Sequence, residues 1–120
     1  LADKNIDIRA ISIAETSDYG VLRLIVDDAE KATFILHQHG FILSMTPVSV
    51  VCVPDEIGGL APVLEALAKG NMDVEYMYSL FTHQDGMAYM VFRIEDEAKF
   101  AELLRPYRIK LAGNEELGLK

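Results

Sequence analysis

Apolar and polar positions alternate along residues 6–14, where Ile6, Ile8 and Ala10 fall on one side of the chain and charged residues on the other. A period of two predicts a half-buried strand. Residues 21–26 follow after a turn as an almost continuous apolar run. Such a run is typical of a central strand that is buried on nearly both faces. The chain therefore opens with two predicted strands.

Helical spacing comes next, with Ala32, Ile35 and Leu36 on one face and Gly40 as the expected stop. Asp27 or Asp28 can cap this helix by accepting from free N–H groups of the first turn. The remaining predictions are a strand at 41–45, then strands at 48–53, 74–81, 87–94 and 108–112, helices at 60–68 and 96–106, and a polar tail at 113–120.

The predicted elements repeat. Residues 5–8 align with residues 71–74 at an offset of 66, and the offset becomes 68 at the second helix, where Lys31 meets Lys99. The second copy reads β-α-β-β-α-β, while the first lacks about 19 residues of strand and helix at its start. We expect that the natural protein is longer at its N-terminus, or that another chain supplies this strand.

Composition narrows the class of partner. The chain has 120 residues, and its net charge of -8 gives it no electrostatic hold on nucleic acid. The single cysteine, Cys52, excludes an internal disulfide framework and fits a cytoplasmic location. No apolar run reaches ~18 residues, so no membrane span is expected. His37 and His39 lie two apart on a helix, so they point to different faces and predict no metal site.

The residues from Val50 to Leu60, the helix around Leu64 and the step Gly70-Asn71-Met72 together resemble a tandem pair of ACT domains. The resemblance implies an α+β fold of two ferredoxin-like βαββαβ sandwiches side by side, with the first unit at 1–46 and incomplete at its N-terminus, and the second at 47–120. It also implies a regulatory module that binds a small amino acid, is not an enzyme and needs no cofactor. Ile57 departs from the family pattern, in which many loops have Pro before Gly.

In the family, two units join through their second strands into one eight-stranded sheet, and the ligand lies at their junction. The residues that the resemblance implies for one site are Asp55, Ile57, Gly58, Gly59 and Leu60, with Asn5 and Ile6 from the first unit; Asn71 and Met72 belong to the mirror site.

The loop before the second-unit helix has a physical logic of its own. Gly58 and Gly59 permit close approach of a ligand, and the helix start that follows favours a carboxylate. Asp55 can pair with an α-ammonium, and Asn5 offers both a donor and an acceptor. The same residues also fit a tight turn with Asp55 as a helix cap, and Asn5 and Asn71 also fit helix stops.

Two other functions stay open. One is a module for oligomerisation or protein interaction without a ligand, including a homodimer, in which the edge strands carry the contacts. The other is a regulatory subunit of an amino-acid biosynthetic enzyme such as an acetolactate synthase. No nucleophile elbow, phosphate loop, dinucleotide fingerprint or zinc signature occurs in the sequence.

Overall fold

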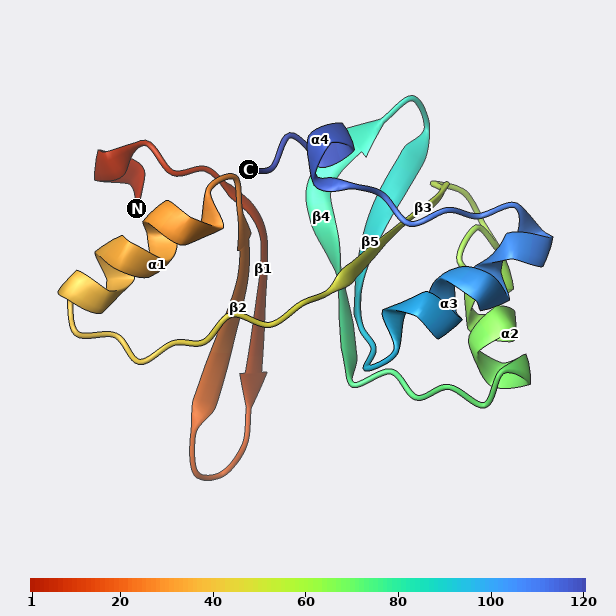
Figure 1. The fold of residues 1–120 in the computed structure, drawn as a ribbon, viewed down its shortest axis with the longest axis horizontal. Helices are drawn as coiled ribbons and strands as arrows, with labels where there is room; N and C mark the ends of the chain where they lie inside the picture. The colour runs from red at the N-terminus through yellow and green to blue at the C-terminus, as the bar shows by residue number, and fades with distance from the viewer. The chain divides into compact units, whose positions relative to one another are not determined.

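The computed structural model describes residues 1–120 as two compact units (Figure 1). The first unit consists of Leu1–Thr46 together with Asn114–Lys120, and the second of Pro47–Gly113. The sequence predicts a second unit of residues 47–120, whereas residues 114–120 group with the first unit. The structure describes each unit by itself, so the side-by-side arrangement stays a prediction.

The second unit has the order β-α-β-β-α. Its strands form one antiparallel sheet in the order β3-β5-β4. Its elements are β3 (Ser49–Pro54), α2 (Ala61–Lys69), β4 (Tyr76–Gln84), β5 (Met87–Arg93), α3 (Glu97–Leu104) and the 3₁₀ turn η2 (Arg105–Tyr107). This is the predicted ferredoxin-like arrangement, because β5 lies between β3 and β4 and the two helices pack on one face of the sheet.

The strand predicted at 108–112 is reduced to a single antiparallel bridge between Val51 and Leu111. One further hydrogen bond, from Ala112 N–H to the carbonyl of Val50, supports it at 2.7 Å. Arg108 is left-handed and Gly113 follows closely, so too few residues remain for a longer ladder. The chain nevertheless returns to the outer edge of β3, as the βαββαβ order requires.

The core of the second unit lies between the sheet and the two helices. Phe92 on β5 and Phe100 on α3 are fully buried, with ring centroids 5.4 Å apart in a tilted arrangement. The apolar stripe of α2 supplies buried Val63, Ala66 and Leu67, as its helical spacing predicts. Pro62 is accommodated because it lies in the first turn, where no N–H is needed.

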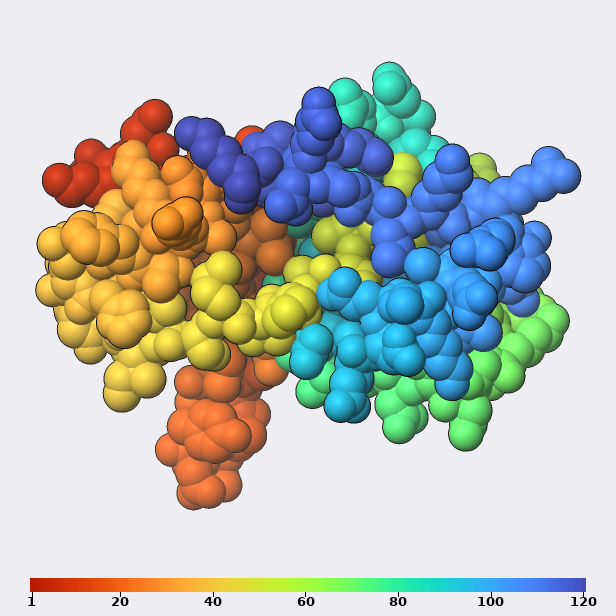
Figure 2. Space-filling model, in the orientation of Figure 1, coloured from red at the N-terminus to blue at the C-terminus, as the bar shows by residue number.

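The first unit is smaller. Its elements are the 3₁₀ turn η1 (Ala2–Lys4), β1 (Ile8–Glu15), β2 (Gly20–Val26), α1 (Ala29–Gln38) and α4 (Asn114–Leu117). β1 and β2 form an antiparallel hairpin whose turn extends past the helix of the same unit (Figure 2). One small cluster of buried residues in this unit consists of Ile6, Val26, Ala32 and Ile35.

The C-terminal segment is held to the first unit by two hydrogen bonds. Arg9 Nη1 donates to the carbonyl of Leu117 at 2.9 Å. The N–H of Lys120 donates to the carbonyl of Asp27 at 2.8 Å. The polar tail predicted at 113–120 therefore contains a short helix and contacts β1 and the residue that follows β2.

The internal repeat is confirmed by the main-chain hydrogen bonds. Four helical segments end in the same left-handed cap, in which an apolar residue donates its N–H to the carbonyl of a leucine five residues earlier. The pairs are Ile6–Leu1, Phe41–Leu36, Met72–Leu67 and Ile109–Leu104, and the left-handed residues are Asn5, Gly40, Asn71 and Arg108. The caps at Asn5 and Asn71 are related by the offset of 66, and those at Gly40 and Arg108 by the offset of 68.

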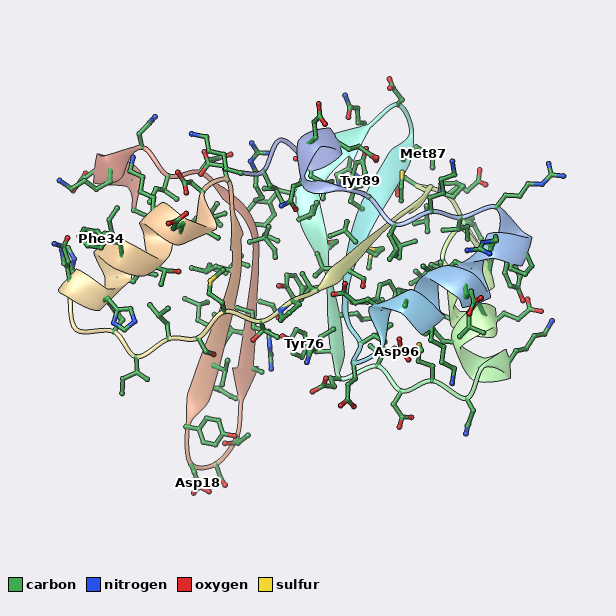
Figure 3. All side chains as sticks on the ribbon, in the orientation of Figure 1. Asp18, Phe34, Tyr76, Met87, Tyr89 and Asp96 are labelled. Carbon is green, nitrogen blue, oxygen red and sulfur yellow. The ribbon has the colours of Figure 1, made fainter.

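The helix starts repeat as well. Asp28 Oδ1 accepts from the N–H of Lys31 at 3.1 Å, and Asp96 Oδ1 accepts from the N–H of Lys99 at 3.0 Å. Asp96 is labelled at the start of α3 in Figure 3. The side chains of Asp28 and Asp96 thus satisfy equivalent N–H groups of α1 and α3, again at the offset of 68.

The strand predicted at 41–45 is absent, and Phe41, Ile42 and Met45 are exposed. By the offset of 68, this segment corresponds to residues 109–113, which bridge to β3 in the second unit. The first unit has no counterpart of β3 or α2, so residues 41–45 have no strand to pair with. Other apolar side chains of this unit are exposed too, among them Leu22 and Phe34, the latter labelled in Figure 3.

Candidate functional site

The predicted binding loop, residues 55–60, joins the end of β3 to the start of α2. The N–H of Asp55 donates to the carbonyl of Gly86 at 2.8 Å, which continues the β3–β5 ladder one step beyond Pro54. Two short-range hydrogen bonds then close the turn. The N–H of Gly59 donates to the main-chain carbonyl of Glu56, and the N–H of Ala61 donates to the carbonyl of Gly58. The loop is therefore a tight, hydrogen-bonded turn.

The two glycines of this loop are required for different reasons. Gly58 has φ +80, a conformation that side-chain-bearing residues rarely adopt, and its missing side chain would face open space. Gly59 has an ordinary φ but is buried, and a Cβ there would collide with the carbonyl oxygen of Pro54. Gly58 leaves the outer surface of the turn accessible, while Gly59 lets the turn pack against the strand end.

Several amide groups of the turn have no partner within the chain. The N–H groups of Ile57, Gly58 and Leu60 make no hydrogen bond, and Pro62 contributes no N–H to the first turn of α2. The N-cap of α2 is Leu60, which has no side-chain cap. The alternative that Asp55 caps the helix is therefore wrong, because it lies five residues before the N-cap. The free N–H groups and the helix dipole favour an anion at this end of α2.

The side chain of Asp55 contacts that of His83, which no sequence pattern predicts. Its Oδ2 lies 3.2 Å from Nδ1 of His83, near the end of β4, and both side chains are 56% exposed. No local sequence signal connects residues 55 and 83, since the contact depends on the order of the strands in the sheet.

Asn71 and Met72 lie at the opposite end of α2 from the loop. The helix has nine residues, which separates its ends by roughly 14 Å. Asn71 is exposed and left-handed with φ 51, as a helix stop requires, and Met72 is half-buried against the core. The second unit thus does not bring these two residues together with residues 55–60, in keeping with their assignment to a different site.

Asn5 and Ile6 repeat this arrangement in the first unit. Asn5 has φ 61 and is exposed at the end of η1. Ile6 is buried beside Val26 and Ile35, so its side chain packs in the core. The interpretation of both asparagines as helix stops is confirmed, and their role in binding stays a prediction.

The one ion pair with a shifted pKa lies toward the C-terminal end of α2, away from the loop. On α2, Lys69 Nζ lies 2.9 Å from Glu65, and this hydrogen bond and charge lower the pKa of Glu65 and raise that of Lys69. Both side chains are exposed. No cluster of three or more potential metal-ligating side chains occurs in the chain. None of its helices has the length and apolar character needed to cross a membrane.

One hollow of the second unit is open to solvent and lies away from the loop. It is lined by Pro47, Arg93, Glu95, Asp96 and Glu97. Arg93 ends β5, whereas the loop lies beside Met87, at the start of that strand (Figure 3). Three of the five lining residues are acidic, so a ligand carboxylate would meet groups of like charge there.

A family model for an ACT domain pair matches residues 1–118. The chain belongs to the ACT domain family. ACT domains are regulatory modules that bind small ligands, and the tandem ACT protein predicted from the sequence is confirmed at this level. Among solved structures, this ACT pair is similar to protein BT0572 from Bacteroides thetaiotaomicron. The TM-score is 0.85 at 34% identity, over 98% of this chain and 80% of that chain. A search of curated proteins finds no match.

Proposed function

We propose that this ACT pair binds a free amino acid at the loop of residues 55–60 and acts as a sensor of that amino acid. The observation that carries the proposal is the pairing of free N–H groups at Ile57, Gly58 and Leu60 with an exposed carboxylate at Asp55. A zwitterion presents one group of each charge, so it complements both.

The carboxylate of the ligand is expected at the turn. Three N–H donors lie close together in sequence at the start of α2, and no side chain of the chain occupies them. An amide donating to a carboxylate makes a charge-assisted hydrogen bond, which is stronger than a neutral one. The exposed side chain of Ile57, beside the donors, favours an apolar ligand side chain.

The ammonium of the ligand is expected at Asp55. A carboxylate has about four lone-pair positions, and the contact with His83 uses only one oxygen. The family resemblance further assigns Asn5 and Ile6 to the same site, and Asn71 and Met72 to its mirror. Asn5 and Asn71 would contribute their exposed side chains, and Ile6 its main chain.

A thermal-shift screen of the protein against the twenty amino acids tests this proposal. One or two related amino acids should raise the melting temperature by several degrees, since a ligand at ~100 times its Kd adds about 2.7 kcal/mol. Asp55→Ala and Gly58→Val should remove the shift, the first by deleting the carboxylate and the second by straining the turn. A wild-type protein that does not respond to any of the twenty would contradict the proposal.

A ligand-free interaction module is the second candidate, and the exposed apolar side chains of the first unit favour it. Leu22, Phe34, Phe41 and Ile42 are each more than half exposed.

A protein partner, such as a biosynthetic enzyme, would be needed for amino-acid binding to act as an allosteric signal. The two candidates separate on Asp55→Ala, which should leave assembly intact if assembly uses the first unit.

A further inference from the structure

We propose that His83 is a positioning residue that holds the Asp55 carboxylate in the orientation that receives the ligand ammonium. This inference rests on the function proposed above and assigns a further residue to the same loop. The contact itself is the 3.2 Å approach of His83 Nδ1 to Asp55 Oδ2. Three features of the second unit fix its geometry.

The first feature is the β4–β5 hairpin. Asp85 and Gly86 have φ 52 and 73, which is the signature of a two-residue type I′ turn between paired strands. The same turn provides the Gly86 carbonyl that accepts from the Asp55 N–H at 2.8 Å. One rigid hairpin therefore holds Asp55 through its main chain and through its side chain.

The second feature is the register of the sheet. Ala88 on β5 pairs with Val53 on one side and with His83 on the other. Because alternate residues of a strand share a face, Asp55 lies on the same face as Val53, and therefore on the same face as His83. This is the face on which α2 packs, so the carboxylate and the free N–H groups of the loop lie on one side of the sheet.

The third feature is the small residue between them. β3 and β4 are separated by β5, hence by about 10 Å. Ala88 is buried and ends at its methyl group, which leaves the space above β5 through which the two side chains meet. A break in the β4 register between Ser79 and His83 further alters the course of the strand before His83.

The contact is suited to orienting a group rather than to stabilising the fold. Ion pairs this exposed contribute little to stability. When Nδ1 of His83 donates to Oδ2, Oδ1 of Asp55 remains open to a second donor. A fixed carboxylate loses less conformational freedom when it binds an ammonium than a freely rotating one does.

The first test uses the unliganded full-length chain. In ¹H–¹⁵N spectra, His83→Ala should shift the amides of Asp55, Ile57 and Gly58, while His83→Asn should keep them near their wild-type positions because its amide donates from about the same place. His37→Ala, an exposed histidine in the first unit, is the matched control. Loop amides that are unchanged in His83→Ala would overturn the positioning role whether or not a ligand binds.

The second test compares two probes, the amino acid that gives the largest thermal shift and the same acid with hydrogen in place of its amino group. His83→Ala should weaken binding of the amino acid on the order of threefold to tenfold and leave the amine-free acid unaffected. His83→Asn should restore binding. Equal loss for both acids would overturn the inference. If His83→Ala shifted the loop amides but the wild-type protein bound no amino acid, both the inference and the proposed function would be wrong.

Discussion

Replacement of Gly59 by alanine is expected to lower the free energy of unfolding of the second unit by about 3 kcal/mol or more. The added Cβ would collide with the carbonyl oxygen of Pro54, which is main chain at the end of β3 and has no freedom to rotate away. The collision can be relieved only if the turn moves away from the end of β3, and this movement would remove Leu60 from its contact with the core.

Gly58→Ala is the matched control for this change. Its Cβ would meet no atom within 4 Å, so its cost comes only from the positive φ and should be about 1 kcal/mol. Urea unfolding followed by tyrosine fluorescence measures both, because four of the five tyrosines lie in the second unit. Equal losses for the two variants would mean that the tight approach of Gly59 to Pro54 is not present in solution.

Phe100→Ala is expected to destabilise the second unit by about 3–5 kcal/mol. Phe100 is fully buried on α3, and its ring packs against that of Phe92 in the sheet. Removing it leaves a cavity at the centre of the core, between α3 and the sheet. A comparable loss is not expected from any exposed aromatic residue.

Phe81→Ala tests that contrast. Phe81 lies on β4 and is 58% exposed, so its replacement should cost no more than about 1 kcal/mol. The same urea unfolding experiment applies to both variants. If Phe81→Ala were as destabilising as Phe100→Ala, the core would not lie between α3 and the sheet as described.

Much of the second unit follows from local patterns. The apolar stripe from Leu60 to Ala68 places α2, and Asp96 places the start of α3, because periodicity and capping are properties of neighbouring residues. The repeat could also be predicted, because Asn5 and Asn71 occupy equivalent positions in the two copies. Both residues adopt the left-handed conformation.

The failures share a cause, which is dependence on partners distant in sequence. Residues 41–45 have the composition of a strand but lack a strand to pair with, and 108–112 find only one bridge. The contact of Arg9 with Leu117 spans 108 positions, and that of Asp55 with His83 spans 28. Local propensity contains no information about such pairs, so the tail and the histidine were missed.

The most direct test of amino-acid binding at residues 55–60 is a titration of the ¹⁵N-labelled protein with the amino acid selected by thermal shift. The account predicts that the amides of Ile57, Gly58 and Leu60 move most, because they donate to the ligand carboxylate. If those three amides stayed in place while others moved, the ligand would bind elsewhere. If no amide moved with any amino acid, the protein would not be an amino-acid sensor.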